Sequence, residues 1–230
     1  MYEISFPTPD EMKELKSFST HFEFSDSEFI SEQFTILDDE TIKIRTWARI
    51  LAQRLRELNF SYIMASFYYH NGIPDEPYYD KVSNKFFPQF KEKPHWSNKE
   101  GFEYYGEIFL LKSFSALDTI AHIVSINYGI EMRIVSFNKT LINKLQEKDP
   151  LRSSKLKTII ESESFNEFRK LRNDSTHNIS PGQVDSGIIK DRNGMTITSV
   201  GSYTPTSQRY VTMTSLKDTV FEILDIIKVD

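Results

Sequence analysis

The chain contains no cysteine among its 230 residues. This absence excludes a disulfide framework, a thiol nucleophile and any metal site built on thiolates. His21, His70 and His95 lie in unrelated contexts, without the His-x-x-x-His spacing typical of a metal site. We therefore assign no metal ion to the chain.

The glycine-rich motifs that bind phosphates are also missing. There is no Gly-x-x-x-x-Gly-Lys loop, no Gly-x-Gly-x-x-Gly turn and no Gly-x-Ser-x-Gly elbow. Kinase, P-loop nucleotidase, dinucleotide oxidoreductase and α/β-hydrolase activities each depend on motifs of this kind. The sequence therefore supports none of these activities, and we expect no cofactor.

An excess of positive charge is absent too. Lys and Arg number 28 against 33 Asp and Glu, so the formal net charge is −5. The molecule as a whole is therefore not an electrostatic nucleic-acid binder, and any contact with RNA must be local. Arg169 and Lys170, which lie next to Arg172, form the candidate RNA-binding patch.

No secretory signal is visible, because residues 1–5 lack a basic segment followed by an apolar run. The most apolar stretch, 108–126, is interrupted by Lys112, Asp118 and His122. This pattern favours a helix buried in a bundle over a membrane span. We therefore expect a cytoplasmic protein that does not associate with membranes.

Apolar residues at helical spacing predict a mainly α fold, an antiparallel helical bundle. Helices are expected at about 10–17, 40–69, 99–128, 135–147, 151–160 and 165–178, followed by a last helix from 215. The helix at 40–69 carries its apolar stripe at Ile44, Trp47, Ala48, Leu51, Leu55, Leu58 and Tyr62. The last helix carries its stripe at Leu216, Val220, Ile223, Leu224 and Ile227.

Local signals predict where these helices begin and end. Ser97-x-x-Glu100, Ser164-x-x-Glu167 and Ser215-x-x-Asp218 have the spacing of capping boxes, and Gly129 stands where a helix commonly stops. Residues 70–97 contain four prolines and are expected to form a long loop. We expect residues 1–99 to be an N-terminal extension packed on a bundle formed by residues 100–230.

A small β insertion is expected at about 184–213, before the last helix. Asn193-Gly194 is typical of a two-residue type I′ turn, with strands at about 186–191 and 195–200. Residues 209–213 are expected to add a third strand. Two interpretations remain open: the insertion shapes a substrate entrance, or it shields the end of the bundle.

Arg172-Asn173-Asp174-Ser175-Thr176-His177 is the segment that carries the most chemistry. It ends the helix whose core face is expected at Phe165, Phe168 and Leu171. The planar fork of an arginine fits phosphate oxygens, and a histidine can exchange a proton near neutral pH. Arg172 and His177 are therefore the candidate catalytic pair, and Asn173 and Asp174 are auxiliary residues that orient it.

Positions five apart on a helix differ by roughly 140° in direction, so Arg172 and His177 do not share a face. A homodimer resolves this difficulty, because a two-fold axis brings both copies of each residue into one cleft. The alternative is a helix-terminal histidine favoured by the helix dipole beside a solvated arginine.

Asp118 is a further auxiliary candidate. It lies four residues before His122 and therefore shares a helix face with it. Either the carboxylate orients a second histidine in the cleft, or the two residues form a local hydrogen-bonded pair within the bundle.

Arg172-Asn173-x-x-x-His177 resembles the Arg-polar-x(3–5)-His signature of the HEPN superfamily, the higher eukaryote and prokaryote nucleotide-binding domains. The apolar helix from about Tyr104 to Tyr128 resembles the core helix of that superfamily, and the resemblance covers about 100–228. It implies an all-α bundle, often dimeric. Many members are metal-independent RNases, whereas others are non-catalytic binding partners.

Two functions follow from this resemblance. The first is a metal-independent endoribonuclease, a toxin or defence effector that is controlled by a protein partner or antitoxin. The second is a non-catalytic HEPN module that binds nucleotide, RNA or a protein. A nuclease requires Arg172 and His177 to be reachable from solvent in a basic cleft, whereas a binding module tolerates them buried or apart.

Overall fold

The computed structural model describes residues 5–17, 29, 39–75, 90, 92–177, 188–190, 194, 196–198 and 204–228. These residues are mainly helical. The elements are α1 (Pro9–Ser17), α2 (Asp39–His70), α3 (Lys93–Asn127), α4 (Lys139–Gln146), α5 (Pro150–Glu161), α6 (Glu163–His177), β1 (Ile188–Lys190), β2 (Thr196–Thr198) and α7 (Thr206–Ile227).

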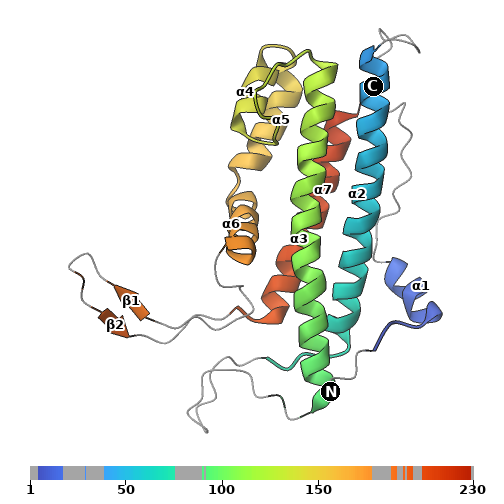
Figure 1. The fold of residues 1–230 in the computed structure, drawn as a ribbon, viewed down its shortest axis with the longest axis vertical. Helices are drawn as coiled ribbons and strands as arrows, with labels where there is room; N and C mark the ends of the chain where they lie inside the picture. Colours follow the sequence, from blue (N-terminus) through green and yellow to red (C-terminus); the bar gives the residue numbers. More distant parts are fainter. Residues whose placement is uncertain are drawn as a thin grey trace.

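The long helix α3 is the centre of the bundle (Figure 1). It runs antiparallel to α2, and α7 packs behind the pair. Helices α4, α5 and α6 line the other side of α3, with α6 running antiparallel to it. α2 lies within the expected extension 1–99, and it packs along α3. The domain boundary near 99 stays a prediction.

Helices α1 and α2 confirm the predictions for 10–17 and 40–69. Every residue of the predicted α2 stripe is buried except Trp47, which is partly buried against the core. The same side chains that repeat at helical spacing therefore form the α2–α3 interface.

Helix α3 begins at Lys93, six residues before the predicted start, so the capping box at Ser97 is wrong. Pro94 lies in the first turn, where a proline needs no hydrogen-bond partner for its nitrogen. The hydroxyl of Ser97 instead donates to the Lys93 carbonyl inside the helix. The predicted end is confirmed, because Gly129 follows the helix with a φ of 58°.

α3 is the one described helix that is long and apolar enough to cross a membrane. Its most apolar window has a mean hydropathy of 1.4, and 61% of that window is buried inside the protein. The core helix of a bundle has these same properties, and Ser113 and Thr119 within it are fully buried against neighbouring helices.

The short helices α4, α5 and α6 begin at side-chain caps. The Asn138 side chain accepts hydrogen bonds from the backbone of Thr140 and Leu141, and Asp149 accepts one from Arg152. α4 therefore begins at 139, not at 135. At the start of α6, the Ser162 hydroxyl accepts from the Phe165 backbone at 3.2 Å.

The capping box predicted at Ser164 is therefore wrong. α6 begins at Glu163, and the residue that caps its first turn is Ser162. The predicted core face of α6 is confirmed, since Phe165 and Phe168 are each 1% exposed and Leu171 is partly buried against the core.

Helix α7 begins at Thr206, nine residues before the expected cap at Ser215. The third strand predicted at 209–213 is therefore wrong, and the insertion cannot extend to 213. The Asp75 carboxylate accepts a hydrogen bond from the Thr206 backbone at 2.9 Å and another from its hydroxyl. A buried carboxylate from a distant loop thus caps α7, which no local pattern predicts.

β1 and β2 pair antiparallel, with Lys190 opposite Thr196. A regular ladder on a two-residue turn at 193–194 would place Lys190 opposite Ile197, so the observed register differs by one residue. Gly194 has a φ of 80°, and Asn193 lies outside the described residues. Figure 1 shows the two strands apart from the helices, beyond the C-terminal end of α6.

Candidate functional site

Arg172 lies on the inward side of α6. It follows Phe165 by seven residues and Phe168 by four, so it continues their buried stripe toward α3. Its guanidinium carbon is 5.2 Å from the ring centroid of Phe114 on α3. Arg172 is half-buried and its Nε is fully buried. Arg172 is therefore not the fully solvated arginine of the alternative interpretation.

His177 is the last residue of α6. The placement of its side chain lies outside the described part of the chain, so only its position on the helix is known. Its backbone is about 7.5 Å further along the axis than that of Arg172 and turned by roughly 140°. One copy of the chain therefore presents the two residues in different directions.

The other predicted residues of α6 surround this inward arginine. Lys170 and Asn173 are exposed, and Asp174 is half-buried. Arg169 is half-buried, with its guanidinium carbon 5.8 Å from the Phe165 ring centroid. In the predicted RNA-binding patch, Lys170 is therefore exposed to solvent, whereas Arg169 lies against its own helix, α6.

Asp118 lies on α3, four residues after Phe114. Its carboxylate accepts hydrogen bonds from the Ser136 hydroxyl at 2.9 Å and the Phe137 backbone at 3.0 Å. It thereby ties the segment before α4 to α3. Along the helix axis it is about 6 Å from Phe114, the residue whose ring contacts Arg172.

His122 does not hydrogen-bond to Asp118 among the described contacts; it stacks on Trp47 of α2. The two ring centroids are 3.8 Å apart and the planes differ by 5°. Burial lowers the pKa of His122, the negative charge of Asp118 opposes this effect, and the positive charge of Arg54 adds to it. His122 is therefore more often neutral than an exposed histidine.

A groove between α3, α6 and α7 runs beside the motif. We call it the motif groove; its volume is about 30 Å³ and its lining residues are Phe102, Glu103, Gly106, Glu107, Leu110, Leu171, Ser175, Arg209, Thr212 and Met213. Leu171 and Ser175 flank Arg172 on α6. The lining contains two carboxylates and one arginine, so it carries no excess positive charge.

An ion-pair network crosses this groove. Arg209 of α7 donates from Nη1 to Oε2 of Glu103 on α3 at 2.5 Å, and its Nη2 donates to Oε1. Lys99 donates to the same carboxylate at 2.8 Å. The Lys99 ammonium is also 3.9 Å from the Asp75 carboxylate that caps α7. This network joins the beginning of α7 to α3.

The positive charges around Glu103 affect its pKa more than its burial does. Burial alone would raise the pKa of Glu103, but Arg209 and Lys99 lower it further than burial raises it. Glu103 therefore remains ionised at neutral pH. The sequence analysis missed the pair of Arg209 and Glu103, because the two residues are 106 positions apart. The only local indication was the i,i+4 spacing of Lys99 and Glu103.

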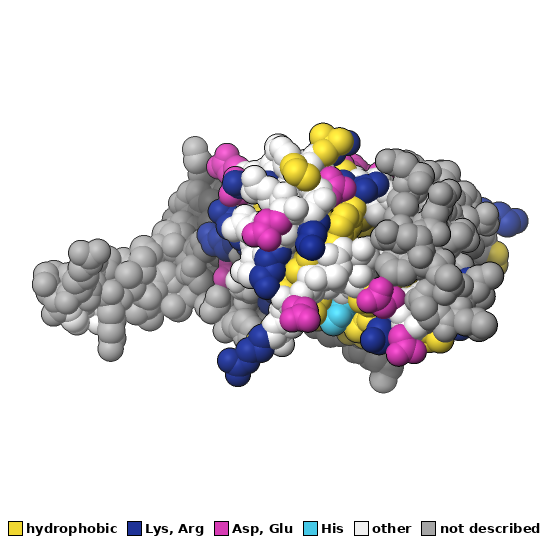
Figure 2. Space-filling model, turned by 90° about the horizontal axis from the view of Figure 1, so that it is seen from above, with side chains coloured by type: hydrophobic (Ala, Val, Ile, Leu, Met, Phe, Trp, Pro, Cys, Tyr) yellow, Lys and Arg dark blue, Asp and Glu magenta, His cyan; other side chains and the backbone are white. Residues whose placement is uncertain are grey.

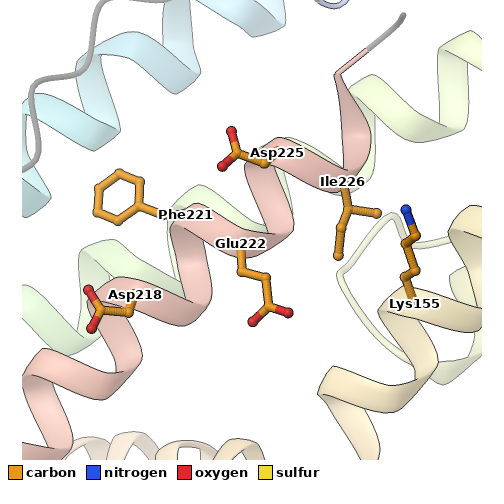
Figure 3. A pocket seen from close by; sticks show the side chains of 6 residues that line it. All are labelled: Lys155, Asp218, Phe221, Glu222, Asp225 and Ile226. Atoms are coloured by element: carbon orange, nitrogen blue, oxygen red, sulfur yellow. The ribbon is translucent and has the colours of Figure 1, made fainter.

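A second, more open cavity of about 540 Å³ lies between α5 and α7, away from the motif (Figure 3). Asp218, Glu222 and Asp225 stand on successive turns of α7 there, with Lys155 of α5 opposite (Figure 3). Its acidic lining would repel a phosphate.

Figure 2 shows the end of the bundle at which α3 ends, which is the upper end in Figure 1 and not the end toward which α6 runs. Over the coloured part of that face, basic and acidic side chains alternate with apolar patches, without a continuous basic area. No group of three or more His, Asp or Glu side chains that could hold a metal ion is found in the described ranges. Binding of RNA to the face seen in Figure 2 would depend on single Lys or Arg side chains.

Comparison with known proteins gives one match. A family model described as Cthe2314-like HEPN matches residues 47–228, which is well over half of the chain. The match begins within α2, at residue 47, and extends to the end of α7. Searches of curated proteins and of solved structures found no match.

Proposed function

The chain belongs to the Cthe2314-like HEPN family, and we propose that it is a metal-independent endoribonuclease whose site is completed in a homodimer. The observation that carries this proposal is the Arg172-Asn173-x-x-x-His177 motif at the end of α6, with the arginine seated on the Phe114 ring of α3. Contact with an aromatic ring does not itself neutralise a guanidinium.

The proposed reaction is an internal transesterification of RNA. His177 removes the proton from a 2′-hydroxyl, whose oxygen then bonds to the adjacent phosphorus. The bond from phosphorus to the 5′-oxygen breaks, and the partner's His177 supplies a proton to that oxygen. Arg172 holds the phosphate and stabilises the charge that builds up on it. The products are a 2′,3′-cyclic phosphate and a 5′-hydroxyl.

The dimer is proposed from geometry. Within one copy, Arg172 and His177 differ by roughly 140° in direction on the same helix. A two-fold axis beside the end of α6 would let the arginine of one copy serve the histidine of the other. In this proposal Lys170 and Arg169 contact the RNA backbone, and Asn173 and Asp174 orient the pair.

The proposed biological role is that of a cytoplasmic toxin or defence effector, held inactive by a protein partner or antitoxin. An unregulated ribonuclease would damage the RNA of its own cell. The strands before α7 lie beyond the end of α6 (Figure 1), and we propose that they border the entrance to the site.

A second candidate function is a non-catalytic HEPN module that binds nucleotide, RNA or a protein partner. The observation that favours it is the half-burial of Arg172, together with Glu103 and Glu107 in the neighbouring groove. An arginine that only packs α6 on α3 would have these same surroundings.

The two functions differ in one assay. Wild type, His177→Ala and Arg172→Met are incubated with mixed cellular RNA in EDTA. Methionine replaces the arginine because it keeps apolar contact with Phe114 while removing the charge. General acid–base catalysis is typically worth about 100- to 10,000-fold, and a donor that stabilises transition-state charge is worth about 100- to 1,000-fold, so each variant should nearly abolish cleavage.

His70→Ala is the matched control, since His70 ends α2 as His177 ends α6. The control should cleave like wild type. Equal cleavage by wild type and His177→Ala would contradict the catalytic role. RNA left intact by a folded wild type, measured together with binding of the same RNA, would favour the binding module.

A further inference from the structure

We infer that Phe114 is a positioning residue for Arg172: its ring on α3 holds the motif guanidinium in place through a cation–π contact. The guanidinium carbon lies 5.2 Å from the ring centroid, within the range of an attractive contact. For its consequence in cleavage this inference rests on the proposed function, but the contact itself can be measured without RNA.

The ring is itself held by the core. Phe114 packs partly buried against the core cluster, and its centroid is 6.2 Å from that of the buried Phe165 on α6. Ser113, which precedes it, and Leu117, three residues further along α3, are at most 1% exposed. Phe114 therefore has a fixed place from which to orient a side chain of α6.

Arg172 occupies a position where a core residue would ordinarily stand. The stripe of α6 runs from Phe165 to Phe168 and then reaches Arg172, at spacings of three and four residues. Such half-burial strengthens an attraction between a cation and a ring, because less water competes for the charge. The aliphatic part of the arginine completes the stripe, and its charged end meets the ring face.

Arg209 of α7 also lies over a ring, since its guanidinium carbon is 5.0 Å from the Phe102 centroid. Arg209 is paired with the Glu103 carboxylate through both terminal nitrogens. Arg152 donates to the carbonyls of Ile226 and Lys228. A ring contact and polar partners thus occur together at Arg209, and Phe114 is the ring partner of Arg172.

The contact is tested on the full chain by a double-mutant cycle of Phe114→Leu and Arg172→Met in urea unfolding. Leucine keeps an apolar side chain but has no ring face. A cation–π contact should appear as a coupling of about three- to tenfold in the unfolding equilibrium constant. A cycle of Phe114→Tyr with Arg172→Met should instead show coupling near zero, because tyrosine retains the ring and the contact with Arg172 is not removed.

An NMR spectrum of the arginine side chains gives a second readout. The Arg172 δ-proton resonances should be shifted upfield by the ring in wild type and Phe114→Tyr, and the shift should vanish in Phe114→Leu. Coupling that is absent from the Phe114→Leu cycle, with the same arginine resonances in all three proteins, would overturn the inference. A purely packing role for Phe114 predicts that outcome.

Cleavage then tests the consequence for the site. Misplacement of a phosphate-binding group costs about ten- to a hundredfold in rate, so Phe114→Leu should lose that much in kcat/KM while Phe114→Tyr restores most of it. Full activity in folded Phe114→Leu would overturn the positioning role. If wild type cleaves no RNA, the proposed function fails, and the coupling and the NMR shift still decide whether Phe114 holds Arg172.

Discussion

Gly101→Ala probes a close approach between α2 and α3. A Cβ atom at position 101 would lie 2.6 Å from each of three ring atoms of Tyr68. Tyr68 is only 1% exposed, its hydroxyl donates to the Ser5 carbonyl, and its ring is stacked 5.9 Å from that of Tyr105. The ring cannot move away without losing these contacts.

The expected magnitude follows from two opposing effects. Overpacking a well-filled core costs about 1–3 kcal/mol. Alanine in a helix interior is favoured over glycine by about 1 kcal/mol. We therefore expect Gly101→Ala to lower the free energy of unfolding by about 1 kcal/mol, which for a chain of this size lowers the Tm by about 2–4 °C.

Gly106→Ala is the matched control on the same helix. Its new Cβ would lie 3.4 Å from the sulfur of Met213, which is ordinary contact with a flexible side chain. The gain in helix propensity should then dominate, and the variant should be stabilised by about 0.5–1 kcal/mol. Urea and thermal unfolding measure both variants. A Tm that rises in Gly101→Ala as it does in Gly106→Ala would refute the reasoning.

Three further predictions concern the charged groups of the bundle. Arg152→Ala removes the donors to the carbonyls at the end of α7 and should cost about 2 kcal/mol in urea unfolding; an unchanged midpoint would contradict this. The pKa of Glu103 is lowered in the folded state, so its stabilisation is present above about pH 4.5 and is lost as the pH falls through the folded pKa. Glu103→Gln should therefore be less stable than wild type at pH 7, the difference should shrink as the pH falls below 4.5, and a difference independent of pH would exclude this linkage. Burial lowers the pKa of His122, so its contribution is present above about pH 6.5 and lost on further acidification. His122→Gln should make the free energy of unfolding depend less on pH below pH 6.5. An unchanged pH dependence would contradict this contribution of His122.

The sequence predicted those parts of the fold that depend on local pattern. The stripe from Ile44 to Tyr62 predicted α2, because one helix face buried against α3 requires that spacing. Gly129 marked the end of α3 correctly, since the chain needs a positive φ there. The motif was placed correctly at the end of α6.

Errors arose where distant residues decide the structure. The β-branched residues Val211 and Thr212 favour a strand, yet they lie in α7 because Asp75 caps its first turn and Arg209 pairs with Glu103. These partners are more than 100 residues apart in the sequence. No periodicity within 204–215 encodes them.

The environment of Arg172 was in part predictable. Its spacing from Phe165 and Phe168 is that of a core position, so an inward direction could have been inferred from the sequence. The contact of Arg172 with Phe114 could not have been inferred, because the packing of the whole bundle decides which two helices pair. The spacing of Asp118 and His122 suggested a pair, whereas their hydrogen-bond and stacking partners are Ser136 and Trp47.

The chemistry of the RNA ends tests the central claim most directly. Wild type and His177→Ala are incubated with a defined single-stranded RNA in EDTA, and the fragment ends are identified by mass spectrometry. We predict 2′,3′-cyclic phosphate and 5′-hydroxyl ends from wild type, and no fragments above background from His177→Ala. Fragments with 3′-hydroxyl ends, or identical fragments from both proteins, would contradict a nuclease built on Arg172 and His177.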